Sequence, residues 1–291
     1  MDKKELVILC VGGDFRHGYM SSALAEHSNV YTLGVCPTGG NAVSLDCIED
    51  MDCKADMLVL PMMKSKSRCE SLDIPLPQGG EVSCHKLSGV LKKGALVTGG
   101  MLSVAQIEYF SALGFEVADY FKREELVIKN CIPTAEGALQ IAMNETGITI
   151  FGSKVLIIGY GRVAKACANL FKGAGAYCAA AARKSSALAE AENAGLSAFK
   201  INDLADRVSY YDIIINTVPA MVIDESVLRN ISKDGLIIDL ASKPGGVDFT
   251  CAKELNRRVV HALSLPGKCA PIIAGKIIAE TVMDIFHERG K

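Results

Sequence analysis

The sequence predicts an α/β protein of two domains, each built on a parallel β-sheet. Short apolar runs alternate with helix-like segments almost throughout the chain, and most of these runs are continuous rather than alternating. Continuous apolar runs are typical of parallel strands that are buried on both faces. The length of 291 residues suits one to two domains, because a domain commonly takes about 150 residues.

The predicted elements fall into two sets, which set the domain boundaries. We expect a first domain over 1–130, a connecting helix within 131–150, a second domain over 151–270, and a tail helix over 271–291 that packs on the first domain. The predicted strands are 6–12, 29–35, 56–60, 95–99 and 115–118 in the first set, and 154–159, 177–182, 212–218, 236–241 and 259–263 in the second. The predicted helices include 103–113, 162–172, 187–194 and 249–256.

One polar segment, 64–81, interrupts the first domain. It contains prolines, paired glycines and charges of both signs. This composition predicts an exposed loop or a hairpin, in a position to cover a site.

Composition excludes several classes of protein. The net charge is −2, which gives no basic field for nucleic acid. The eleven cysteines form no C-x-x-C pair and have no zinc-site spacing, so we expect no metal and a reduced, cytoplasmic protein. The first apolar run is too short for a signal peptide, and no run approaches the length that spans a bilayer.

A glycine motif gives the strongest functional signal. The predicted strand 154–159 leads directly into Gly159-Tyr160-Gly161-Arg162-Val163-Ala164, and a helical pattern follows. In such a turn the first glycine permits the tight bend, the second admits a dinucleotide diphosphate, and the small third residue lets the helix pack on the sheet. We predict contacts to the cofactor from residues 159–163. The alternative is a tight turn without a ligand.

The end of the following strand indicates which dinucleotide binds. An NAD site usually places an acidic residue there for the ribose 2′-hydroxyl. This chain instead has Arg183, Lys184 and Ser185, which suit a 2′-phosphate and favour NADP. The alternative is a solvated basic turn. Together these motifs predict a Rossmann-like second domain, with a flavodoxin-like first domain and a cleft between them.

Three further segments follow predicted strands of the second domain, at the edge where open α/β sheets bind ligands. We expect Asn216, Thr217, Val218 and Pro219 to lie on the nicotinamide side of the cofactor. Lys243, held by Pro244 and two glycines, and Lys268 are candidates for binding a substrate carboxylate. For each segment an ordinary surface turn is the alternative.

The first domain contributes a second group of candidates. Asp14, Arg16 and His17 follow its first strand: Arg16 suits a carboxylate, Asp14 can orient Arg16, and His17 titrates in the range useful for proton transfer. The alternative is an Asp–Arg structural pair with a solvent-facing histidine. Thr98 ends another strand of this domain and is a further candidate for contacting the substrate.

The connector contributes the last candidates. The segment 131–137 has a proline, then Thr134 as a candidate helix N-cap and Glu136 in the first turn. We expect this helix start to line the cleft between the domains, where Thr134 and Glu136 would contact the substrate.

Together these motifs resemble the A-subunit family of dipicolinate synthase over essentially the whole chain. The resemblance rests on GGDFR, IPTAEG, GYGRVAK, ARKSS, INTVPA, DLASKPGGVDF and LPGKCAP, in this order. One position departs from the family pattern, because Lys243 stands where the family commonly has arginine. Lysine keeps the charge but loses the two-pronged hydrogen bonding of a guanidinium, which weakens the case for a carboxylate contact there.

The resemblance implies a reaction and partners. It implies NADP-dependent oxidation of dihydrodipicolinate, or its hydrated precursor, to dipicolinate in the mother-cell cytoplasm during sporulation. The substrate is a small dicarboxylate, for which Arg16, Lys243 and Lys268 are candidate ligands, and His17 or Asp14 is the candidate base. The resemblance also implies, as partner, the flavoprotein-like B-subunit of dipicolinate synthase, and we expect a homo-oligomer.

Two other functions remain open at this point. The first is a D-2-hydroxyacid-dehydrogenase-like oxidoreductase, whose chemistry needs a histidine near the end of the cofactor domain. His261 is the nearest histidine, but it lies within an apolar strand, which favours packing over catalysis. The second is a non-catalytic NADP-binding subunit that depends on a partner for chemistry.

Overall fold

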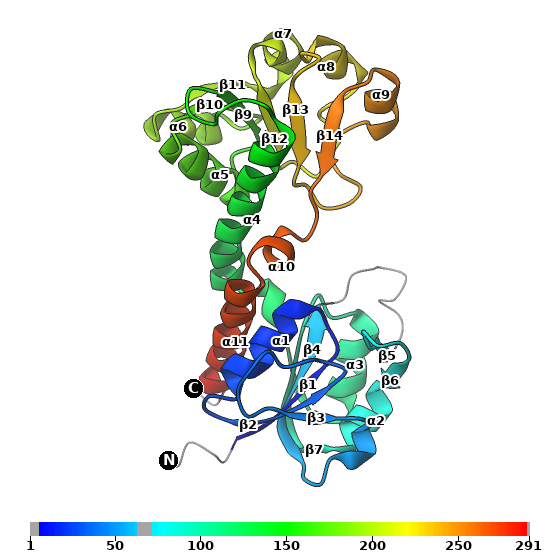
Figure 1. Ribbon diagram of the computed structural model, residues 1–291. Coiled ribbons are helices and arrows are strands. Elements are labelled where there is room, and N and C mark those ends of the chain that lie inside the picture. Colours follow the sequence, from blue (N-terminus) through cyan, green and yellow to red (C-terminus); the bar gives the residue numbers. More distant parts are fainter. Residues whose placement is uncertain (1–5, 63–71, 290–291) are drawn as a thin grey trace. The chain divides into compact units, whose positions relative to one another are not determined.

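The computed structural model describes residues 6–62 and 72–289, and it divides the chain into two compact units (Figure 1). Unit 1 combines residues 1–130 with 270–291, and unit 2 comprises residues 131–269. The segment 131–150, which we expected to connect two domains, therefore belongs to unit 2. No helix in the described ranges has the length and apolar character needed to cross a membrane.

Unit 1 is built on a parallel sheet with the strand order β3-β2-β1-β4-β7-β8. The predicted fold class, two parallel-sheet α/β domains, is confirmed. The flavodoxin-like detail needs correction, because a flavodoxin sheet has the order 2-1-3-4-5 whereas this order matches the dinucleotide-binding fold. The difference arises from β3, a short and mostly exposed strand that we did not predict. The strands are β1 (Val7–Val11), β2 (Asn29–Leu33), β3 (Val43–Leu45), β4 (Ala55–Met62), β7 (Leu91–Gly100) and β8 (Glu116–Asp119).

A small antiparallel hairpin accompanies this sheet. It pairs β5 (Asp73–Pro75) with β6 (Glu81–Ser83). The predicted loop or hairpin 64–81 falls partly here, while its residues 64–71 lie outside the described residues. Within the described part, the hairpin is the form that the chain adopts.

Helices cover both faces of the unit 1 sheet. The tail helix α11 (Pro271–Glu288) packs against α1 (Phe15–Leu24), and Figure 1 shows the two side by side. The contact is close at Gly275, where an added Cβ would lie 2.5 Å from the Arg16 carbonyl oxygen. Ion pairs Lys129–Glu280, Arg123–Glu288 and Arg289–Glu116 tie α11 to its own unit. The remaining elements are α2 (Cys84–Gly89), α3 (Val104–Ala112) and the 3₁₀ turns η1 (Ile48–Asp50) and η3 (Tyr120–Lys122).

Unit 2 has the parallel strand order β11-β10-β9-β12-β13-β14. In sequence order this is 3-2-1-4-5-6, the arrangement that binds dinucleotides where the strand order reverses. The strands are β9 (Lys154–Ile158), β10 (Tyr177–Ala182), β11 (Ser197–Lys200), β12 (Ile213–Asn216), β13 (Leu236–Asp239) and β14 (Arg258–His261). Only β11 was not predicted, because its sequence is short and half polar.

The long helix α4 (Glu124–Glu145) begins in unit 1 and continues into unit 2. The expectation of a helix start at 131–137 is wrong: Pro133 and Thr134 lie in the helix interior. The N-terminal acids Glu124 and Glu125 suit the positive end of the helix dipole. The Cys269 thiol donates to the Pro133 carbonyl at 3.0 Å.

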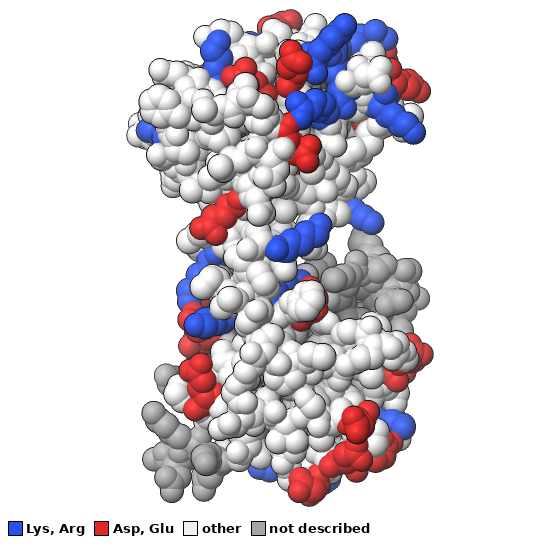
Figure 2. Space-filling model, in the orientation of Figure 1, with Lys and Arg blue, Asp and Glu red and all other residues white. Residues whose placement is uncertain are grey.

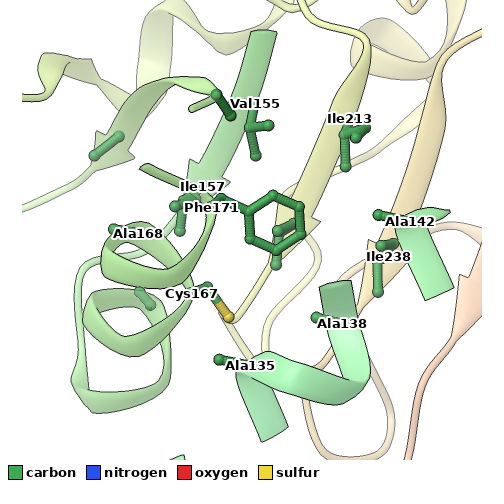
Figure 3. Packing of buried hydrophobic residues seen from close by; sticks show 14 of the residues in the cluster. Ala135, Ala138, Ala142, Val155, Ile157, Cys167, Ala168, Phe171, Ile213 and Ile238 are labelled. Atoms are coloured by element: carbon green, nitrogen blue, oxygen red, sulfur yellow. The ribbon is translucent and has the colours of Figure 1, made fainter. Parts of the chain in front are cut away.

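The α4 segment within unit 2 is kept helical by tertiary packing. Its small side chains Ala135, Ala138 and Ala142 are buried against Cys167, Phe171 and Ile238, as Figure 3 shows. Small residues let the helix approach the Phe171 ring closely. The other helices of unit 2 are α5 (Arg162–Gly173), α6 (Ser185–Asn193), α7 (Leu204–Arg207), α8 (Glu225–Asn230), α9 (Phe249–Glu254) and α10 (Leu265–Cys269), with the 3₁₀ turns η4 (Ile201–Asp203) and η5 (Val208–Tyr210).

Candidate functional site

The turn after β9 has the backbone that its glycines predict. Gly159 has a φ of +91°, a conformation that residues with side chains rarely adopt. An added Cβ there would lie 2.5 Å from the Thr217 Oγ1 atom. The Gly159 amide donates to the Ala181 carbonyl at 2.8 Å, which holds the turn beside the end of β10. This position therefore requires glycine for both conformation and space.

Gly161 serves a different purpose in the same turn. It is the N-cap of α5, and no side chain caps the helix. An added Cβ on Gly161 would meet no atom within 4 Å, so local packing does not explain the glycine. The fully buried Ala164 brings the helix close to the sheet. An uncapped helix start at an open glycine fits a diphosphate, which takes backbone N–H donors and the positive end of the dipole.

The basic segment after β10 lies beside this turn. Arg183, Lys184 and Ser185 are exposed and follow directly from Ala182 at the end of the strand. The hydrogen bond from the Gly159 amide to the Ala181 carbonyl holds the end of β10 beside the glycine turn, and these three residues come directly after that strand end. Within the described ranges, no ion pair neutralises Arg183 or Lys184. Figure 2 shows basic and acidic side chains interspersed on the face of unit 2 that is in view.

The segment after β12 is bound into the edge of the sheet. The buried Asn216 side chain donates to Asp239 Oδ1 at 2.8 Å and accepts from the Val218 amide at 3.1 Å. Thr217 donates to the Ile158 carbonyl at 2.8 Å. The Asn216 and Thr217 side chains thus support the loop, which leaves the half-buried Val218 and the exposed Pro219 at its surface.

Asp239 shapes the loop that carries Lys243. This buried carboxylate accepts from the Ala241 amide at 3.1 Å and from the Gly246 amide at 3.0 Å, in addition to Asn216. Lys243 is exposed at the carboxyl edge of the sheet, and Lys268 is exposed on α10. Sequence reasoning missed the Asn216–Asp239 pair, because only the register of β12 and β13 places the two side chains together.

In unit 1, Asp14 and Arg16 form a two-pronged pair. The Arg16 Nε and Nη2 atoms donate to the two Asp14 carboxylate oxygens at 3.0 and 2.7 Å. Only 3 % of the Arg16 side chain is exposed, against 27 % for Asp14. Asp14 also caps α1 by accepting from the Arg16 amide. The structure therefore favours the alternative of an Asp–Arg structural pair, and substrate binding by Arg16 stays a prediction.

His17 completes the cap of α1, and its side chain is buried. The expectation of a solvent-facing histidine beside the Asp–Arg pair is therefore wrong. The His17 Nδ1 atom accepts from the Asp14 amide at 3.1 Å, which makes Nε2 the protonated nitrogen of the neutral ring. Nε2 lies 3.5 Å from the hydroxyl of the buried Tyr120, which donates to the Leu60 carbonyl. Sequence reasoning did not find Tyr120, because nothing local marks it as a partner of His17.

The surroundings of this cluster shift the pKa values of Asp14 and Tyr120. Burial alone would raise the pKa of Asp14, but the hydrogen bonds that its carboxylate accepts from Arg16 and the nearby guanidinium charge hold that pKa well below its usual range. Burial also raises the pKa of Tyr120 well above its ordinary value. Asp14 therefore remains ionised and is a weak proton acceptor.

The candidate residues divide between the two units. Unit 1 carries Asp14, Arg16, His17 and Thr98, and the Thr98 hydroxyl is buried without a hydrogen-bond partner among the described residues. Unit 2 carries all the cofactor candidates together with Lys243, Lys268, Thr134 and Glu136. Thr134 is half-buried and Glu136 is exposed on α4. We find no group of metal-ligating side chains suited to a metal ion within 6–62 and 72–289.

Comparison with known proteins agrees with this geometry. Residues 134–244 match the NAD-binding domain of the D-isomer specific 2-hydroxyacid dehydrogenases. Over 168 residues, 58 % of this chain and 57 % of the relative, the sequence is 39 % identical to the dipicolinate synthase A-subunit of Bacillus subtilis (strain 168). The chain also superimposes on solved structures of this A-subunit. The resemblance to the dipicolinate synthase A-subunit is confirmed.

Two of these structures cover nearly the whole chain. The Bacillus halodurans A-subunit is 27 % identical with a TM-score of 0.85, covering 97 % of this chain and 98 % of that one. The Bacillus subtilis protein is 29 % identical with a TM-score of 0.83, covering 97 % and 96 %. A transhydrogenase of Sinorhizobium meliloti, 14 % identical with a TM-score of 0.68, covers 96 % and 93 % and shares the fold.

These matches identify the domain type of unit 2. Its domain type is that of a nicotinamide-dinucleotide-binding domain, and the chain is related to oxidoreductases. The glycine turn and the uncapped start of α5 lie within the matched region.

Proposed function

We propose that this protein, which resembles the dipicolinate synthase A-subunit, performs the NADP-dependent oxidation of dihydrodipicolinate, or its hydrated precursor, to dipicolinate. The observation that carries the proposal is the coincidence of this resemblance with a dinucleotide turn whose neighbouring strand is followed by Arg183 instead of an acidic residue. Aromatisation of the ring supplies the driving force.

The cofactor residues have separate tasks in this proposal. Gly159 and Gly161 admit the diphosphate at the start of α5, while Arg183, Lys184 and Ser185 bind the 2′-phosphate. Tyr160, Arg162 and Val163 flank the diphosphate, and the loop 216–219 borders the nicotinamide. A bound NADP would supply the hydride acceptor, and a base would take the proton that leaves the ring. The protein contributes positioning and electrostatics.

The substrate is a dianion, and cationic side chains are its proposed ligands. Lys243 stands on a loop held by the buried Asp239 carboxylate, which gives its backbone a defined position. Lys268 and Arg16 are the further carboxylate ligands that we propose, with Thr98, Thr134 and Glu136 as polar contacts. Arg16 must share its guanidinium with Asp14 in that role.

For the proton acceptor we propose His17 in preference to Asp14. The low pKa of Asp14 makes its carboxylate a weak base. His17 contacts protein groups through both ring nitrogens, so accepting a proton at Nδ1 requires release of the Asp14 amide.

We further propose that the protein works with a flavoprotein-like partner, the B-subunit of dipicolinate synthase, forms a homo-oligomer, and acts in the mother-cell cytoplasm during sporulation. The resemblance to a protein named as one subunit of a synthase supports the need for a second. A non-catalytic NADP-binding subunit is therefore the second candidate function.

Turnover by the purified chain separates these functions. With NADP and freshly generated dihydrodipicolinate, an enzyme produces the pyridine absorbance together with NADPH in equal amounts. No turnover by the chain alone, followed by activity after addition of the partner, supports the dependent subunit. No turnover in either case contradicts both.

The match to the 2-hydroxyacid dehydrogenases supports a third candidate function, that of a D-2-hydroxyacid-dehydrogenase-like oxidoreductase. The histidine required for that chemistry is not provided by His261. This residue ends β14, its Nε2 lies 3.4 Å from the Ala241 carbonyl, and its ring packs on Phe249. Reduction of a small 2-keto acid by the chain alone would restore this alternative.

We expect Arg183→Asp to weaken NADP binding roughly thirtyfold while NAD binding changes by less than about threefold. The reason is that only NADP carries the phosphate that a guanidinium binds through charge-assisted hydrogen bonds. Calorimetric titration with each dinucleotide measures the two affinities. Equal weakening for both would contradict the phosphate assignment.

A further inference from the structure

A third basic residue lies beside the proposed phosphate-binding segment. Lys200 ends β11, where it is the register partner of Ala182 at the end of β10. Its ammonium group donates to the Ser185 hydroxyl at 2.7 Å. The sheet register and this hydrogen bond thus place Lys200 next to the segment 183–185, although Lys200 is seventeen positions after Arg183 in the sequence.

The charges at this edge of the sheet are not balanced by acids. Arg183, Lys184 and Lys200 are all exposed, and within 6–62 and 72–289 no ion pair neutralises them. By contrast, Lys165 on the neighbouring helix α5 forms an ion pair with Glu190 on α6 at 2.7 Å, so its charge is neutralised. Like charges gathered without counter-charges repel one another and favour an anion between them.

The hydrogen-bond direction adds chemical specificity. Because the Lys200 ammonium donates to the Ser185 oxygen, the hydroxyl keeps its own hydrogen for donation to an acceptor. A phosphate monoester offers only acceptor oxygens and carries nearly two negative charges near neutral pH. Ser185 also opens α6, whose N-cap Lys184 provides no side-chain cap. These features together fit a phosphate better than a ribose hydroxyl.

We propose that Lys200 is a specificity residue for the dinucleotide, binding the 2′-phosphate of NADP together with Arg183 and Ser185. This inference rests on the proposed NADP dependence and adds a residue from β11 to the selection of the cofactor. Lys200 acts directly through its charge and also by orienting the Ser185 hydroxyl toward the phosphate.

Calorimetric titration of the full chain with four ligands tests this inference. The ligands are NADP, NAD, adenosine 2′,5′-bisphosphate and AMP, so that each pair differs only in the 2′-phosphate. Lys200→Gln is expected to weaken NADP and the bisphosphate about tenfold, with NAD and AMP within about twofold of wild type. Lys200→Arg keeps the charge and is expected to restore most of the affinity.

Lys253→Gln is the matched control, because Lys253 is an exposed lysine on α9 of the same unit and its loss changes the net charge equally. It is expected to bind all four ligands as wild type does. Unchanged NADP affinity in Lys200→Gln, or equal weakening of NADP and NAD, overturns the role of Lys200 alone. A wild-type protein that binds NAD as tightly as NADP instead overturns the proposed cofactor, and this inference with it.

Discussion

Gly161→Ala is expected to weaken dinucleotide binding by at least about a hundredfold while unit 2 remains folded. Gly161 caps α5 with open space at its Cβ position, so a methyl group there meets no protein atom. The same methyl group occupies the space where the diphosphate must approach the backbone. Each tenfold loss of affinity corresponds to about 1.4 kcal/mol, which the diphosphate contacts readily supply. Calorimetry measures binding, and thermal unfolding without cofactor measures folding.

Two other glycines provide the controls for this experiment. Gly173→Ala, on the same helix and also without atoms near the added Cβ, should bind the dinucleotide normally. Gly159→Ala should lose both stability and binding, because its φ is +91° and the added Cβ would lie 2.5 Å from Thr217 Oγ1. Normal binding by Gly161→Ala would mean that the turn holds no diphosphate.

Asp14→Ala is expected to lower the free energy of unfolding by about 2–4 kcal/mol. The substitution leaves the Arg16 guanidinium buried without its carboxylate partner. It also removes the N-cap of α1, a loss that commonly costs about 1 kcal/mol. Urea denaturation measures the change. Asp224→Ala is the control, since Asp224 caps α8 on an exposed site without a buried arginine. Equal losses in the two variants would show that the Asp14–Arg16 pair adds nothing beyond the cap.

The same pair predicts the effect of acid. The pKa of Asp14 is lower in the folded protein than the value of about 3.9 in an unfolded chain. Its contribution to stability is therefore complete above about pH 5 and is lost as the pH falls below the unfolded pKa toward the folded one. Asp14→Asn, which cannot titrate, should show a shallower loss of stability between about pH 5 and 3 than wild type. Identical pH profiles would contradict a lowered pKa at Asp14.

Local sequence patterns predicted most of the architecture because the relevant physics is local. Continuous apolar runs such as 154–159 and 236–241 can be satisfied only by strands buried on both faces, and both became strands. The errors fall where local signals are weak or conflicting. β3 and β11 are short with polar residues, and Pro133 indicated a helix start although packing of the following alanines keeps α4 continuous.

The candidate sites show the same division. Glycine at 159 and 161 and the basic segment at 183 could be predicted because a strand–turn–helix motif places them by covalent geometry alone. Three other features could not be predicted: the hydrogen bonds by which Asp239 fixes the loop that carries Lys243, the contact between Tyr120 and His17, and the position of Lys200. Each joins residues distant in sequence through strand register or helix packing.

By itself the amino-acid sequence determined the two parallel-sheet domains, the dinucleotide turn and the absence of an acid after β10, because hydrophobic periodicity and glycine chemistry act over a few residues. Only the tertiary structure decided that Arg16 is buried in an ion pair and that His17 completes a helix cap. It also decided that Lys200 lies beside the basic segment 183–185. Burial and long-range pairing depend on how distant segments pack, and no local pattern encodes them.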